Sequence, residues 1–302
     1  MTATAVAADR RTARLAALAL IAVTAIWGST FAISKDLIER LPVADYLGLR
    51  FLVAAAVVAA VRPRLLRQLD RATVRTGIGL GLLYAVAQLL QFVGLQHTAP
   101  TISAFVVSLY VVFTPLMAAV LLRTPPDRTA LLGTVLATVG VAVMSLRGGA
   151  IGNGELLTAA SAAIYAAHIL AMARWSRPGA AFALTFVQLL TMGAVLSLVA
   201  VDDGLQVPRA ADLPAFLYLT VIAAGVALLV QTWAQGHLPA TQASVLMVLE
   251  PVWAAVFALL LWSEQLGPRT VLGGLLILSA MLLVVARPSA PAVPEPPPPV
   301  HP

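Results

Sequence analysis

The chain contains 302 residues, of which 60% are hydrophobic and only 11% are charged. Soluble globular proteins carry roughly 25% charged residues, so this composition is typical of a membrane protein and excludes a water-soluble chain. The net charge of +6 does not indicate a nucleic-acid partner, because the basic residues lie singly between apolar stretches. The absence of cysteine excludes disulfides and thiolate metal sites.

Ten apolar stretches follow one another along the chain, separated by short segments in which charged residues, proline and glycine cluster. A helix that crosses a bilayer needs about 20 mostly apolar residues, and each stretch is close to that length. We therefore expect an all-α integral membrane protein with ten transmembrane helices. The expected spans are residues 15–34, 44–61, 74–96, 100–122, 130–146, 154–174, 180–201, 213–235, 240–262 and 268–286.

Basic residues are distributed unevenly between the two sides of the predicted membrane. Thirteen of the 19 fall on the side of the N-terminus and five on the opposite side. Basic residues favour the cytoplasmic side, so both termini are expected there, as an even number of spans requires. The preference for arginine over lysine, together with the high alanine content, favours a bacterial protein of the cytoplasmic (inner) membrane.

Two terminal segments lie outside the predicted spans. Residues 1–14 are expected to form a cytoplasmic N-terminal segment. Residues 288–302 are rich in proline, which interrupts helices, so they are expected to form a disordered cytoplasmic tail.

The two halves of the chain resemble each other when the sequence is shifted by 140 residues. Residues 15–147 then fall on residues 155–287 without a gap, and five spans of one half coincide with five of the other. Because each half has an odd number of spans, the halves are expected to form two inverted five-helix repeats, an architecture that supports alternating access around a site between them. The matching polar pairs include Gln91 with Gln231, His97 with His237 and Thr101 with Thr241.

Polar residues recur at helical spacing inside several predicted spans, for example at positions i, i+4 and i+7 of the third. Since lipid cannot satisfy polar groups, such stripes are expected to face a water-filled cavity, although hydrogen bonds between packed helices are the alternative. We hypothesise that these residues bind the substrate. The candidates are Trp27, Tyr84, Gln88, Gln91, Tyr110, Tyr165, His168, Gln231, Glu250 and Trp253.

Glu250 is the most informative of these candidates, because an ionised carboxylate in the middle of a span costs about 2.5–3.5 kcal/mol. The adjacent Pro251 frees a backbone carbonyl of the preceding turn, which favours a polar environment there. Glu250 is therefore a candidate proton carrier, a candidate counter-ion for a cationic substrate group, or the partner of Arg50 in a salt bridge. Arg50 itself is expected to extend toward the outer interface or to form that salt bridge, rather than to contact substrate.

Motifs of nucleophilic, metal-dependent or nucleotide-dependent chemistry are absent from the sequence. We therefore expect no enzymatic activity and no cofactor or metal, and an energy source in ion gradients rather than ATP. Two other classes stay open: an intramembrane enzyme acting on lipid, and a non-transporting membrane receptor or scaffold. The sequence makes no prediction of the oligomeric state.

Four short segments make the chain resemble the EamA-type members of the drug/metabolite transporter superfamily. They are residues 26–31 (IWGSTF), 49–51 (LRF), 249–252 (LEPV) and 262–266 (WSEQL). In the last segment Ser263 and Gln265 depart from the usual Gly-Glu-Arg-Leu pattern, and the first half has Thr124 where the glutamate would fall.

The resemblance covers about residues 15–287 and implies ten spans in two inverted repeats. It also implies export of small metabolites, amino acids or drug-like compounds through a central cavity lined by the first, third, fourth, sixth, eighth and ninth spans. We accordingly expect a secondary transporter that exports small amphiphilic metabolites, amino-acid-like or drug-like, by alternating access through a central cavity. Its expected partners are that small-molecule substrate and membrane lipid, and Glu250 could couple transport to protons.

Overall fold

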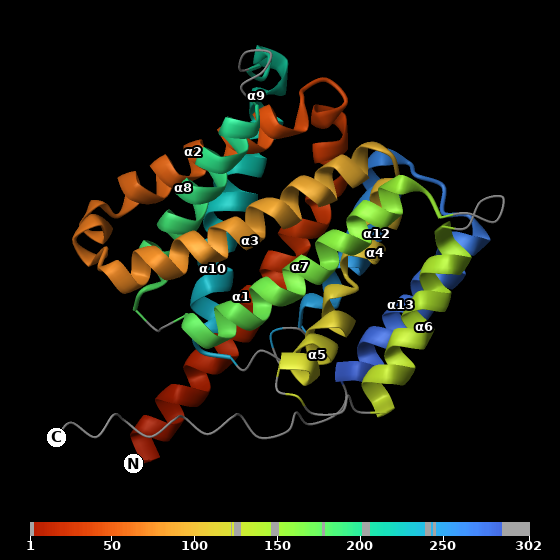
Figure 1. Ribbon diagram of the computed structural model, residues 1–302, viewed down its shortest axis with the longest axis horizontal. Coiled ribbons are helices and arrows are strands. Elements are labelled where there is room, and N and C mark those ends of the chain that lie inside the picture. The colour runs from red at the N-terminus through yellow and green to blue at the C-terminus, as the bar shows by residue number, and fades with distance from the viewer. Residues whose placement is uncertain are drawn as a thin grey trace.

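The computed structural model describes residues 3–121, 123, 128–145, 151–176, 179–200, 206–238, 243 and 246–285, and within them the regular elements are helices, with no strand. Figure 1 shows long helices crossing one another around a common centre. The helices of the first half are α1 (Ala3–Ile38), α2 (Val43–Val61), η1 (Pro63–Gln68), α3 (Arg71–Gln96), α4 (Pro100–Val107), α5 (Tyr110–Leu121) and α6 (Arg128–Ser145). Those of the second half are α7 (Asn153–Trp175), α8 (Ala181–Val199), η3 (Ala210–Asp212), α9 (Leu213–Leu217), η4 (Tyr218–Val226), α10 (Ala227–Gln235), α12 (Leu249–Trp262) and α13 (Pro268–Val285).

Eight helical segments of the described chain are long and apolar enough to cross a membrane. They correspond to the first eight predicted spans, while α12 and α13 are apolar but shorter. The predicted ninth span lies partly outside the described residues, so ten spans remains a prediction. The N-terminal segment is helical from Ala3, where α1 begins, and the predicted disordered tail, residues 288–302, lies outside the described residues.

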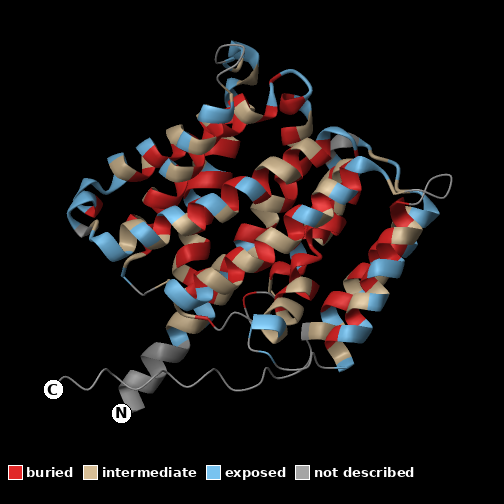
Figure 2. Cartoon of the chain, in the orientation of Figure 1, coloured by how far each residue is buried: buried red, intermediate tan, exposed pale blue. Residues whose placement is uncertain are grey.

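The interior of the molecule contains polar as well as apolar side chains, and many large apolar side chains are exposed on its outer surface. Buried residues follow the centre of the helix arrangement in Figure 2, whereas exposed residues lie along its outer faces. The buried set includes Thr24, Arg50, Gln91 and Glu250, while large apolar side chains such as Leu198 are exposed. This distribution is typical of a bundle surrounded by lipid, which solvates apolar side chains but not polar ones.

The fourth predicted span is divided in two, contrary to the continuous helix expected over residues 100–122. Between α4 and α5 the N–H groups of Leu109, Val111 and Val112 bond to carbonyls three residues earlier, which tightens the chain locally. The Ser108 hydroxyl also donates to the Ala104 carbonyl at 2.7 Å, a back-bond of the kind that bends helices. The break lies directly before Tyr110, a predicted site residue.

The eighth predicted span contains a stretch of π-helix, η4, between α9 and α10. A π-helix has wider turns than an α-helix and is rare, and such segments are frequently found at functional sites. No local sequence pattern distinguishes it, because a π-helix and an α-helix in a membrane share the same apolar composition.

The helix pairs in the most extensive contact all join one half of the chain to the other: α6 with α13, α3 with α7, α2 with α8, α3 with α8 and α1 with α12. Figure 1 shows α6 and α13 side by side at one edge of the molecule. The two helices approach each other at Gly140 and Gly273, where a Cβ atom on either residue would lie 2.8 Å or less from the carbonyl oxygen of the other. Only glycine permits so close an approach.

We predict that Gly140→Ala and Gly273→Ala each lower the free energy of unfolding by about 1–3 kcal/mol, because the added methyl group forces the two backbones apart. Gly79→Ala is the matched control, since a Cβ atom there has no neighbour within 4 Å, and it should leave stability unchanged or slightly higher. Thermal unfolding in detergent would measure all three, and equal stability of the three variants would contradict the packing described.

Candidate functional site

A central cavity of about 60 Å³ lies between the two halves of the chain. Residues from nine elements line it: α1, α2, α3, α4, α5, α7, η4, α10 and α12. Nine of the ten predicted site residues line this cavity, and Trp253 does not. The nine are Trp27, Tyr84, Gln88, Gln91, Tyr110, Tyr165, His168, Gln231 and Glu250.

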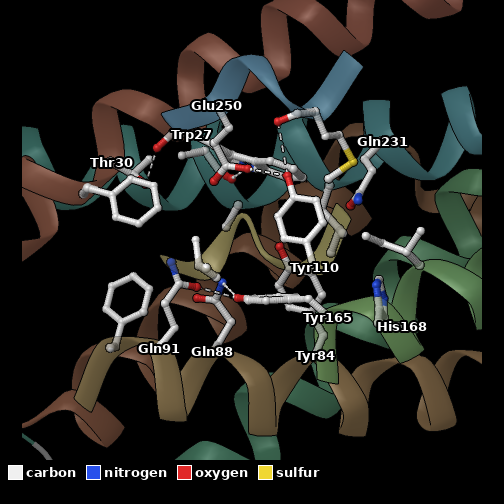
Figure 3. A pocket seen from close by; sticks show the side chains of 18 of the residues that line it. Trp27, Thr30, Tyr84, Gln88, Gln91, Tyr110, Tyr165, His168, Gln231 and Glu250 are labelled. Carbon is white, nitrogen blue, oxygen red and sulfur yellow. Dashed lines mark hydrogen bonds between the residues drawn. The ribbon is translucent and has the colours of Figure 1, made fainter. Parts of the chain in front are cut away.

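One wall of the cavity carries a hydrogen-bonded cluster between α3 and α7. Gln88 donates from Nε2 to the Tyr165 hydroxyl at 2.6 Å, and that hydroxyl donates to Oε1 of Gln91 at 2.7 Å. Figure 3 shows both amides next to the Tyr165 hydroxyl. The spacing of Gln88 and Gln91 on one helix face brings both within reach of a single group, so Tyr165 fixes both amides.

Glu250 lies on the opposite side of this view, where the Tyr110 hydroxyl points at its carboxylate (Figure 3). That hydroxyl lies 3.0 Å from Oε2 of Glu250 and 3.3 Å from the carbonyl oxygen of Met247. The Met247 carbonyl is available because Pro251, four residues later, has no N–H to donate. The polar environment expected beside Pro251 is therefore present, and Tyr110 is the residue that provides it.

Trp27 connects α1 to the π-helix at the cavity. Its indole Nε1 donates to the carbonyl oxygen of Ala223 at 3.0 Å, and two residues further along α1 the Ser29 hydroxyl lies 2.7 Å from the Tyr218 hydroxyl. Ala223 and Ala224 present only a methyl group to the cavity. Trp27 thus holds this part of the π-helix against α1.

His168 is buried and hydrogen-bonded, which agrees with a packed histidine better than with an exposed relay. Its Nε2 lies 3.0 Å from Oε1 of Gln188, and its ring packs edge-on against Tyr84 with 4.8 Å between centroids. The other ring nitrogen, Nδ1, has no partner among the described residues. His168 therefore still presents one polar atom from a residue that lines the cavity.

Arg50 differs from both expectations for it. Its side chain is 4% exposed rather than extended to an interface, and no described acidic residue lies within salt-bridge distance of it. Instead Nε donates to the Leu219 carbonyl at 2.9 Å and Nη1 to the Tyr46 hydroxyl at 3.1 Å. The proposed Arg50–Glu250 ion pair was wrong because carbonyl and hydroxyl oxygens from α2 and η4 hold the guanidinium group.

Trp253 is the one predicted site residue that the fold directs elsewhere. Its Cβ lies where a Cβ on Gly28 would be only 2.6 Å away, so it packs on α1. Its ring neighbours Phe257 at 6.3 Å. A separation of three residues leaves Trp253 and Glu250 about 60° apart around the helix. This rotation is enough for Glu250 to line the cavity while Trp253 packs against α1.

Several lining residues were absent from the sequence-based prediction. Arg50 gave the clearest signal, as a lone charge inside an apolar span. The others are apolar or small and are indistinguishable in sequence from ordinary core residues; they include Thr30, Phe31, Phe51, Phe92 and Met247.

Some polar atoms at the cavity have no hydrogen-bond partner within the described protein and are therefore available to bind a solute. Among the described residues, Oε1 of Gln88, Oε1 of Gln231 and Nδ1 of His168 are buried and unpartnered, and all three residues line the cavity. Buried polar atoms are normally hydrogen-bonded, and unpartnered ones call for a water, ion or ligand. The described residues include no group of three potential metal ligands.

We predict that Tyr165→Phe lowers the free energy of unfolding by about 1–3 kcal/mol, because it leaves two buried amides without a partner. Gln91→Leu should cost less in that background than in the wild-type protein, with a coupling of at least about 0.5 kcal/mol. Thr138→Ala, at an exposed position of α6, should be additive with Tyr165→Phe. Additivity in both cycles, measured by thermal unfolding, would show that the cluster does not act as a unit.

Comparisons with known proteins agree with this architecture. A relative from Archaeoglobus fulgidus, described as an uncharacterized transporter, is 28% identical over 271 residues, which are 89% of this chain and 85% of the relative. A crystal structure of a protein with 20% identity superposes with a TM-score of 0.65 over 91% of this chain and 97% of the other, which supports the fold. The EamA-like transporter family matches the chain twice, over residues 14–146 and 152–286. The chain is a multi-pass membrane protein and belongs to the EamA-like transporter family.

Proposed function

We propose that the protein is a secondary transporter that exports small metabolites, amino-acid-like or drug-like, by alternating access to the central cavity. The observation that carries this proposal is the convergence of nine polar or aromatic residues, from both halves of the chain, on one buried cavity. A membrane bundle held together by packing alone would have no need to gather polar residues with unpartnered atoms at one point. The family assignment supports transport as the general activity.

We further propose that residues 15–147 and 155–287 are inverted repeats that move relative to each other. The described parts of α6, Arg128–Ser145, and of α13, Pro268–Val285, are helical at positions that differ by 140 residues. The only described non-glycine residues with positive φ, Arg123 and Ser263, are separated by the same 140 residues and each has a φ of 52°. The twofold family match over residues 14–146 and 152–286 gives independent support.

The contacts between helices support the same proposal. When each helix is replaced by its equivalent in the other half, helices that were in contact remain in contact. The contact of α3 with α7 corresponds to that of α10 with α1, and the contact of α1 with α12 corresponds to that of α7 with α5. Two equivalent sets of contacts around one cavity would allow either end of the molecule to open at similar cost. This is the physical basis of alternating access in repeat transporters.

Polar contacts join the halves at the end of the molecule where α1 leads into α2. Arg40, after α1, forms a 2.7 Å ion pair with Asp212, before α9. Near the start of α2, Oδ2 of Asp45 accepts from the backbone N–H of Gln206 at 2.9 Å. In the proposed mechanism these contacts close the outer end, and they must break for substrate to leave the cell.

Glu250 has two roles left in this proposal, proton carrier and counter-ion for a cationic substrate group, because no ion pair joins it to Arg50. A carboxyl group that accepts from Tyr110 inside a cavity can exchange a proton or hold a cation, but not both at once. Such competition is a simple means of coupling transport to a proton gradient.

Transport would be tested with purified protein in liposomes, using a panel of metabolites and a pH gradient that is either present or absent. We predict that Glu250→Gln abolishes the stimulation of transport by the pH gradient, since the amide cannot ionise. Glu39→Gln, at an exposed position near the end of α1, is the control and should behave as wild type. A correctly folded wild-type protein that moves no member of the panel would refute the proposed function.

We also propose a bacterial inner-membrane location with both termini in the cytoplasm, supported by the 13 to 5 distribution of basic residues. Single cysteines replacing Arg67 and Arg209, both exposed, can be placed in this cysteine-free chain. On intact cells a membrane-impermeant thiol reagent should label position 209 and not position 67. The reverse labelling would overturn the proposed orientation.

A further inference from the structure

Arg50 is a buried cation at the cavity, and no described acidic residue lies within salt-bridge distance of it. Burying a charge is unfavourable unless it is paired and hydrogen-bonded. The two hydrogen bonds to the Leu219 carbonyl and the Tyr46 hydroxyl orient the guanidinium group, but neither partner carries a negative charge. The proposed transport mechanism assigns this residue no role.

The surroundings of Arg50 suit a planar cation that receives an anion from the cavity. The rings of Tyr46, Phe51 and Phe92 lie 5.7, 5.5 and 5.8 Å from its Cζ atom. These rings stabilise the cation through their faces without neutralising it. A guanidinium group has five N–H donors, and the two bonds described leave donors available to a carboxylate.

Glu250 is the counterpart of Arg50 with the opposite sign. Both residues line the cavity, they come from different helices, α2 and α12, and no ion pair joins them. The carboxylate accepts from the neutral Tyr110 hydroxyl, and no described basic residue lies within salt-bridge distance of it. One cavity thus contains a guanidinium group and a carboxyl group that are each oriented by neutral groups and that form no ion pair with each other.

We propose that the cavity binds a small zwitterion, with its carboxylate at Arg50 and its ammonium group at Glu250; this inference rests on the proposed transport function and narrows its substrate class. A solute with one charge would neutralise only one of the two side chains and leave the other uncompensated. A zwitterion satisfies both and adds no net charge to the site. Oε1 of Gln88 and Oε1 of Gln231 are further acceptors for the N–H groups of such a solute.

The size of the cavity agrees with a small solute. A volume of about 60 Å³ corresponds to roughly four to six water-sized groups, and alanine has six non-hydrogen atoms. Drug-sized ligands occupy pockets of roughly 300–1,000 Å³, far more than this conformation provides.

The test uses three probes of matched size: L-alanine, L-lactate, which lacks the ammonium group, and L-alaninamide, which lacks the carboxylate. Uptake into liposomes that contain the purified protein is measured for each. The wild-type protein should take up alanine with a KM at least tenfold lower than that for either analogue. Glu250→Gln should raise the KM for alanine at least tenfold and that for lactate less than twofold.

Arg50→Gln should show the reverse selectivity, with at least a tenfold rise in KM for alanine and less than a twofold rise for alaninamide. Arg50→Lys keeps the positive charge and should lose less than Arg50→Gln, which separates the role of the charge from that of folding. Arg75→Gln, at an exposed position of α3, is the matched control and should leave all three KM values unchanged.

The outcomes separate the inference from the function on which it rests. Transport of other solutes by a protein that does not discriminate alanine from its two analogues would overturn the zwitterion site and leave the transporter standing. Loss of alanine and alaninamide transport to the same extent in both Arg50 variants would also overturn it, since Arg50 would then be structural. A folded protein that transports nothing would overturn both.

Discussion

The structure depends on the requirement that polar groups inside a membrane bundle find partners within the protein, because lipid offers none. Tyr165 meets this requirement by joining Gln88 and Gln91, and Tyr110 meets it by joining Glu250 to a free backbone carbonyl. Each tyrosine comes from a helix other than the one it serves. The polar side chains therefore fix the relative positions of the helices as well as the cavity.

Small residues make those polar contacts possible by letting the helices approach. At Gly28 an added Cβ atom would lie 2.8 Å from the backbone nitrogen of Ala254 and 3.0 Å from the carbonyl oxygen of Glu250, so α1 and α12 touch through their backbones. This contact brings Trp27 and Glu250 to the same cavity. The contact between α1 and α12 therefore also positions the residues of the cavity. A larger residue at position 28 would move the proposed substrate-binding groups as well as the helices.

Irregular backbone is concentrated around the same centre. The break between α4 and α5 precedes Tyr110, and the π-helix η4 supplies the carbonyl groups that hold Trp27 and Arg50. The first irregularity has hydrogen bonds to carbonyls three residues earlier, and in the second two carbonyl groups accept from side chains of other helices. In a rocking-repeat mechanism they are also natural points for a helix to bend, since fewer regular hydrogen bonds need to break there.

The sequence by itself determined the membrane class, the positions of most helices and nearly all of the polar lining, because apolar length and the helical spacing of polar residues are local properties of the chain. Only the tertiary structure decided which groups the side chains of Arg50 and Trp253 contact. Whether a charged or aromatic residue faces a cavity, a neighbouring helix or an interface depends on rotations of about 60° and on which helix lies opposite. The carbonyl of Leu219, 169 residues away from Arg50 in the chain, and the backbone of α1 beside Trp253 are partners that no local pattern could have revealed.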